Sequence, residues 1–258
     1  MRILVLGAGK MGSFFSDLLS FDHQVAIYDP NPDKLRFTYN VERFSTLENI
    51  SGFNPDLVIN AATVKYTIKA FESLLPHLNN PDCILTDIAS VKTGLPEFYS
   101  RCGFPYASTH PMFGPTFASL SNLANENAII ITEGDERGKL FFRRLYQRLG
   151  LHIEDYSFEE HDLTIAYSLS IPFAATLAFA SVMKPQNAPG TTFKRHHEIA
   201  RGLMSEDDYL LSEILFNPHT SHQLAQICNS LEKLKSIVDK HDTCAMKQYL
   251  DTVRKNLK

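Results

Sequence analysis

Residues 1–156 alternate short, wholly apolar runs with longer segments in which apolar residues recur every three or four positions. Short apolar runs are typical of strands buried on both faces, and the longer period is typical of helices that bury one face. Strands that alternate with helices favour an α/β fold built on a doubly wound parallel sheet. The pattern predicts strands at 2–6, 25–28, 57–60, 84–88, 106–108, 128–132 and 151–156, and helices at 13–20, 64–78, 92–100 and 137–149.

The strand pattern stops after Tyr156, and the rest of the chain predicts helices only. Residues 163–183 carry no charge and are typical of a helix that is apolar on all sides, with a kink at Pro172. A domain boundary therefore falls near residue 155. We expect a first domain over residues 1–155 and an all-α C-terminal domain over 156–258. Its further helices are predicted at 193–204, 207–216 and 224–238 and from residue 242.

The uncharged segment is long enough to cross a bilayer, for which about 20 apolar residues suffice. Hydroxyl side chains and Pro172 interrupt it, however, and a helix apolar on all sides is equally expected at the centre of an obligate dimer. We therefore expect no membrane span, and instead a homodimer formed mainly by the C-terminal helices.

Composition excludes several classes of protein. The 258 residues have a formal net charge of −4, which argues against broad binding of nucleic acid. The four cysteines show no C-x-x-C spacing, and we predict neither a disulfide framework nor a metal site. The chain opens directly on a strand without a signal-peptide pattern, so we expect a cytoplasmic protein.

The first predicted strand is followed at once by the glycine pattern G-A-G-K-M-G at residues 7–12. In a Rossmann-type fold such glycines allow a tight turn, a close approach of backbone to pyrophosphate, and close packing of helix on strand. An acid that ends the second strand can accept hydrogen bonds from both ribose hydroxyls and repels a 2′-phosphate, so Asp29 favours NAD over NADP. The predicted cofactor-binding residues are Gly7, Gly9, Lys10, Met11, Gly12 and Asp29.

Candidate catalytic residues follow later strands of the same predicted sheet. His110 stands in the segment T-H-P-M-F-G-P at Thr109–Pro115, where the proline after it restricts its backbone. Ser90 follows the strand at 84–88. Ligands of open α/β sheets bind outside the carboxyl ends of the strands. A serine there can hydrogen-bond one nitrogen of His110 and leave the other to face a substrate; as an alternative, Ser90 caps a helix.

These segments resemble the prephenate dehydrogenase family. The resemblance rests on G-A-G-K-M-G at 7–12, D-I-A-S-V-K-T-G at 87–94, T-H-P-M-F-G-P at 109–115 and E-H-D-L-T-I-A at 160–166. It implies a step of tyrosine biosynthesis, the NAD-dependent oxidative decarboxylation of prephenate or of its relative arogenate. It also implies that His110 takes the proton of the ring hydroxyl, that Ser90 orients His110, and that a basic residue of the helical domain binds a substrate carboxylate. Arg201 matches that position best, with Arg195 and Lys194 as alternatives.

The chain departs from the family at one motif. Many members carry S-H-L-P-H on the first helix of the second domain, whereas this chain has S-L-S-I-P-F at 168–173 and lacks both histidines. Two alternatives therefore stay open: another two-domain NAD(P) oxidoreductase acting on a β-hydroxyacid or an imine, and a non-catalytic NAD(H)-binding regulatory protein. His161 and Asp162 are interpreted as a helix-start cap and structural pair, with a catalytic dyad as the alternative.

Overall fold

The computed structural model describes residues 1–114 and 123–257, so Pro115 of the T-H-P-M-F-G-P segment lies outside the described residues. Its internal contacts divide the chain into two compact units, Met1–Asp162 and Leu163–Lys258. This division lies after the boundary predicted near residue 155, because the first turns of helix α6 (Phe158–Ile165) contact the first unit.

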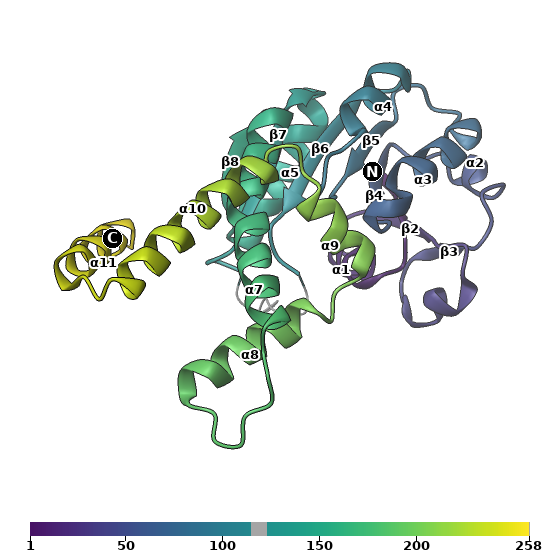
Figure 1. Cartoon of the computed structure of the whole chain (residues 1–258). Helices are drawn as coiled ribbons and strands as arrows, with labels where there is room; N and C mark the ends of the chain where they lie inside the picture. The colour runs from purple at the N-terminus through teal and green to yellow at the C-terminus, as the bar shows by residue number, and fades with distance from the viewer. Residues whose placement is uncertain (115–122, 258) are drawn as a thin grey trace. The chain divides into compact units, whose positions relative to one another are not determined.

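One sheet runs through the first unit, and its strand order among the described residues is β3-β2-β1-β4-β5-β6-β7-β8 (Figure 1). The chain adds β2 and β3 on one side of β1 and then β4 and the later strands on the other side, which is the strand order of a doubly wound fold. The α/β fold with a Rossmann-type sheet is therefore confirmed. The strands are β1 (Arg2–Leu6), β2 (Gln24–Tyr28), β3 (Glu42–Phe44), β4 (Leu57–Asn60), β5 (Ile84–Asp87), β6 (Tyr106–Pro111), β7 (Asn127–Gly134) and β8 (His152–Tyr156).

The sheet differs from the wholly parallel arrangement that the sequence predicts in one place. β6 and β7 pair antiparallel, with a register shift between Ala107 and Thr109, whereas the other neighbouring strands pair parallel. A strand buried on both faces has the same apolar pattern in either direction, so the pattern alone does not predict this reversal.

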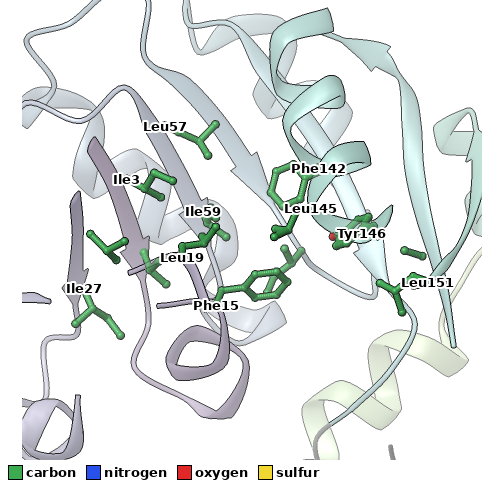
Figure 2. Close-up of a cluster of buried hydrophobic side chains, with 14 of the residues drawn as sticks. Ile3, Phe15, Leu19, Ile27, Leu57, Ile59, Phe142, Leu145, Tyr146 and Leu151 are labelled. Carbon is green, nitrogen blue, oxygen red and sulfur yellow. The ribbon is translucent and has the colours of Figure 1, made fainter. Parts of the chain in front are cut away.

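Helices cover both faces of the sheet. On one face, side chains of α1 and α5 such as Phe15 and Phe142 pack with Ile3 and Val5 of β1 (Figure 2). On the other face, α3 and α4 pack against Leu4 and its neighbours. Because successive side chains of β1 point to opposite faces of the sheet, they contribute to two separate hydrophobic cores. The helices are α1 (Lys10–Leu19), α2 (Ile50–Phe53), α3 (Thr67–Leu74), α4 (Leu95–Arg101) and α5 (Glu136–Leu149), with short 3₁₀ turns at Pro32–Phe37, Val64–Tyr66 and Leu75–His77.

The second unit is all-helical, as predicted. A π-helical segment, Ala166–Ser170, precedes α7, where Pro172 removes a backbone donor. The hydroxyl of Ser170 donates to the carbonyl of Ile214, which fixes this segment to α9. The helices are α7 (Ile171–Ser181), α8 (Thr191–Leu203), α9 (Asp208–Leu215), α10 (Thr220–Asp239) and α11 (Thr243–Asn256).

The apolar side chains of α7 are not buried within the chain. Within the described residues, the continuous helix Phe158–Ser181 is long and apolar enough to cross a membrane by length and composition, and 17% of its most apolar window is buried. Large exposed apolar surfaces often mark protein–protein or membrane contacts, and the homodimer predicted from the sequence stays a proposal.

Candidate functional site

A glycine turn follows β1, and two of its glycines are required by close backbone contacts. Gly7 has φ +95°, and a Cβ there would lie 3.0 Å from the carbonyl oxygen of Ala61. A Cβ on Gly12 would lie 1.8 Å from the carbonyl oxygen of Gly7, so a side chain there would separate α1 from the turn. A Cβ on Gly9 would meet nothing within 4 Å. Packing within the chain therefore explains two of the glycines, while Gly9 faces open space.

Helix α1 begins at Lys10 directly after this turn, with Met11 next. Its N-cap is Gly9, and no side-chain oxygen caps the helix. The amino end of a helix carries backbone N–H donors and a partial positive charge, which together favour a phosphate. Lys10, Met11 and Gly12 therefore lie where the sequence predicts a pyrophosphate site.

Asp29 lies beside the glycine turn at the end of β2. Its Oδ2 accepts a hydrogen bond from the backbone N–H of Ala8 at 2.9 Å, and its Oδ1 accepts one from Asn31 at 2.9 Å. Lys34 forms an ion pair with the same carboxylate at 3.8 Å. Asp29, which is predicted to bind the ribose hydroxyls, therefore contacts the glycine turn that is predicted to bind the phosphates.

His110 lies near the carboxyl end of β6 and is 5% exposed. Burial lowers the pKa of its imidazole well below 6.5, and the neighbouring His161 and the charge of Lys92 lower it further. An unprotonated imidazole is the form that can accept a proton. The ring is therefore unprotonated at neutral pH.

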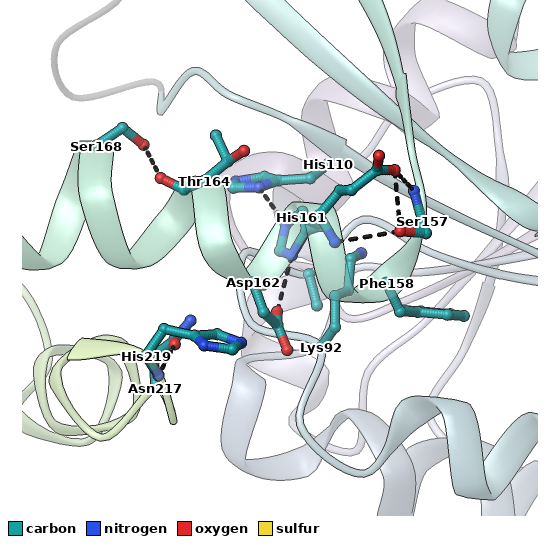
Figure 3. Close-up of polar contacts among 12 residues, drawn as sticks. Lys92, His110, Ser157, Phe158, His161, Asp162, Thr164, Ser168, Asn217 and His219 are labelled. Carbon is teal, nitrogen blue, oxygen red and sulfur yellow. Dashed lines mark hydrogen bonds and ion pairs between the residues drawn. The ribbon is translucent and has the colours of Figure 1, made fainter. Parts of the chain in front are cut away.

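The hydrogen-bond partner of His110 is His161, at the start of α6 (Figure 3). Nδ1 of His110 lies 3.0 Å from Nε2 of His161, and Nδ1 of His161 lies 3.0 Å from Oδ1 of Asp162. The interpretation of His161 as a helix-start cap is wrong, because Ser157 and Glu160 cap α6 through reciprocal hydrogen bonds. The link to His110 spans 51 residues, so no local pattern predicts it.

Ser90 is half-buried in the loop after β5, as predicted, but among the described residues no hydrogen bond joins it to His110. Nδ1 of that ring contacts His161 instead. The predicted hydrogen bond between Ser90 and His110 is therefore not found among the described residues. Its alternative role as a helix cap is not met either, since α4 begins after Gly94.

A buried polar cluster supports this edge of the sheet. Asp87, at the end of β5, accepts hydrogen bonds from Nζ of Lys92 at 2.6 Å and from the hydroxyl of Tyr99 at 2.7 Å. Lys92 also donates to the carbonyl of Thr109 at 2.8 Å. Lys92 and Asp87 are both 0% exposed. The sequence analysis quotes this lysine in S-V-K but gives it no role; here it joins the β5 loop to the residue before His110.

The three basic candidates for the substrate carboxylate lie on α8 in the second unit, and Lys194, Arg195 and Arg201 are all exposed. Lys194 and Arg201 share a face of the helix, because residues seven apart are separated by about two turns. Which of the three binds a substrate remains a proposal.

Within the described ranges, no three His, Cys, Asp or Glu side chains gather in a way that could hold a metal ion.

Comparison with known proteins matches residues 19–151 to the family described as prephenate dehydrogenase, nucleotide-binding domain. The chain is 23% identical over 203 residues to a probable arogenate/prephenate dehydrogenase of Methanocaldococcus jannaschii, which covers 72% of this chain and 44% of that protein. It is 23% identical over 266 residues to the chloroplastic arogenate dehydrogenase 1 of Arabidopsis thaliana, with 92% and 39% covered. The chain thus spans less than half the length of these curated relatives.

Among solved structures, the fold is similar to a prephenate dehydrogenase from Aquifex aeolicus in complex with hydroxyphenyl propionate and NAD⁺. The TM-score is 0.84 at 21% identity, and the match covers 99% of this chain and 96% of that one. At this identity the similarity establishes the fold.

Proposed function

Because the chain belongs to the prephenate dehydrogenase family, we propose that it catalyses the oxidative decarboxylation of prephenate, or of arogenate, with NAD as hydride acceptor. The observation that carries this proposal is a buried base, His110, on the sheet edge that also carries the glycine turn. Loss of hydride from the ring carbon, of the hydroxyl proton and of carbon dioxide leaves an aromatic ring, which makes the reaction strongly downhill.

The residues around the turn fit a dinucleotide. The space beside Gly9, where a Cβ would stand, is empty, and no side chain caps the amino end of α1. These features suit a pyrophosphate approached closely by backbone. The carboxylate of Asp29 would hold the ribose hydroxyls through the lone pairs that its hydrogen bonds from Ala8 and Asn31 leave unused. When bound, the nicotinamide supplies the hydride acceptor.

His110 acts as the general base in this proposal. Burial keeps the imidazole neutral, so it can take the proton of the ring hydroxyl as the ring aromatises. Of the basic residues on α8, Arg201 is proposed to bind a substrate carboxylate, because a guanidinium can hold both oxygens at once. Arg195 and Lys194 remain the alternatives.

The buried base favours an enzyme over a protein that only binds NAD(H), since a nucleotide-binding protein needs no imidazole at this edge. The S-L-S-I-P-F segment, without the family's two histidines, leaves the choice between prephenate and arogenate to experiment. A role in tyrosine biosynthesis and a cytoplasmic location belong to the same proposal.

The test is NADH formation with prephenate and arogenate offered separately. We expect turnover with at least one substrate, and His110→Asn should lower kcat by about two to four orders of magnitude while NAD affinity is retained. His152→Asn, the same change at an exposed ring of β8, is the matched control. Absence of turnover with both substrates, or an active His110→Asn variant, would contradict the proposal.

A further inference from the structure

We infer that His161 and Asp162 are positioning residues for His110, which set through two hydrogen bonds the nitrogen of His110 that carries the proton. This inference rests on the proposed function, because it concerns the base of that reaction, and it assigns to His161 the orienting role that the sequence predicts for Ser90.

The geometry is a linear chain of three side chains. Two contacts of 3.0 Å join Nδ1 of His110 to Nε2 of His161, and Nδ1 of His161 to Oδ1 of Asp162 (Figure 3). The side chain of Asp162 is 24% exposed, while that of His161 is 0% exposed. The chain thus leads from a partly exposed carboxylate to the buried base.

The chemistry of the three groups fixes the direction of both hydrogen bonds. A carboxylate only accepts, so Nδ1 of His161 must carry a proton. A neutral imidazole has one donor and one acceptor, so Nε2 of His161 accepts, and Nδ1 of His110 donates to it. The proton of His110 is then on Nδ1, and its Nε2 holds the lone pair that takes a proton.

This ordering requires that both rings be neutral, because an imidazolium donates from both nitrogens. Burial lowers the pKa of His161 to about 3; the charge of Lys92 acts in the same direction and that of Asp87 opposes it. Burial, His161 and Lys92 lower the pKa of His110 well below 6.5. The charged groups that face the two rings are Lys92, Asp87 and Asp162, from the β5 loop, β5 and α6.

An Asp162→Asn substitution tests the inference. A carboxamide can rotate its NH₂ toward Nδ1 of His161 and donate, which reverses both hydrogen bonds and places the proton of His110 on Nε2, the wrong nitrogen. Reversal of a tautomer by such a change is known to cost a base much of its activity. We expect kcat to fall by roughly 10- to 1000-fold with NAD affinity unchanged. Asp162→Glu, which keeps a carboxylate, should restore most of kcat, and Asp155→Asn on β8 is the control.

The decisive readout is ¹⁵N NMR of the histidine rings, which distinguishes protonated from unprotonated ring nitrogens. In the resting wild-type protein we expect His110 protonated at Nδ1, and in Asp162→Asn at Nε2. A wild-type spectrum with His110 protonated at Nε2 overturns the inference. So does an Asp162→Asn variant that loses kcat without a change of tautomer.

The spectrum is recorded without substrate, so it separates the two proposals. If the wild type fails to turn over prephenate and arogenate, the proposed function fails while the tautomer still decides whether Asp162 orders the pair. The wild-type spectrum alone shows which nitrogen of His110 is protonated. It therefore tests the inference even if the Asp162→Asn variant does not fold.

Discussion

The paired imidazoles of His110 and His161 should make the first unit sensitive to acid. Both rings are buried and neutral, and burial lowers the pKa of each, to about 3 for His161. In the unfolded chain an imidazole has a pKa near 6.5, so below that pH the unfolded state binds more protons than the folded state. Stability is therefore fully present above pH ~6.5 and is lost as pH falls toward the folded-state pKa.

The magnitude follows from this difference in proton binding. Between pH 7 and pH 5, a ring that titrates only in the unfolded state destabilises the fold by about 1.9 kcal/mol. The two rings together destabilise the fold by about 4 kcal/mol, a large share of the ~5–15 kcal/mol typical of a whole protein.

The assay compares the wild type with the double variant His110→Asn/His161→Gln. Urea unfolding at pH 7 and at pH 5 is followed by circular dichroism, and hydrogen exchange of β6 peptides assigns the transition to the first unit. The comparison uses only the change in free energy of unfolding between the two pH values, so a lower starting stability of the variant does not affect it. It should lose about 4 kcal/mol less than the wild type, because other titrating groups are common to both. Equal losses would refute the reasoning that both rings stay neutral when folded.

Three further predictions concern the nucleotide, the substrate and assembly. The wild type should bind NAD more tightly than NADP. Asp29→Ala should reduce the ratio of the two affinities at least about fivefold, because it removes the repulsion between the carboxylate and a 2′-phosphate. Tighter binding of NADP than of NAD by the wild type would contradict the assignment of Asp29. Arg201→Ala should raise KM for the substrate by an amount equivalent to roughly 2–5 kcal/mol if it leaves a buried substrate carboxylate unpaired. A rise in KM for Lys194→Ala with none for Arg201→Ala would assign the role to Lys194 instead. Sedimentation at micromolar concentration should give a homodimer that Leu231→Glu, on the exposed face of α10, weakens; a monomeric wild type would contradict this.

Apolar runs predicted most of the strands, because a strand buried on both faces has apolar residues at nearly every position. Leu57–Asn60 matches its prediction at both ends, for example. β3 was missed, since Glu42–Phe44 has three residues and two of them are charged. The predicted helix at 64–78 is divided into α3 and two 3₁₀ turns, one of them around Pro76, whose missing N–H interrupts a regular helix.

The site was predictable as far as local signals reach. The glycine turn, Asp29 and His110 each stand in a motif, and the structure places them at the carboxyl ends of their strands. The pairing of His110 with His161 and of Lys92 with Thr109 joins segments that are distant in sequence. Such contacts depend on how strands are ordered in the sheet, which a single sequence does not encode in any short pattern.

The ion pair between Lys92 and Asp87 has a consequence for the order in which the molecule opens. Both side chains are 0% exposed, and Lys92 is satisfied only when β5, its loop and the carbonyl of Thr109 on β6 are in place together. Separating any one of them leaves a buried charge without its partner, at a cost of about 3–5 kcal/mol. Local fraying near His110 is thereby suppressed, and amide exchange there should require the same cooperative event that unfolds the central sheet. We therefore expect His110 to belong to the part of the first unit that opens last.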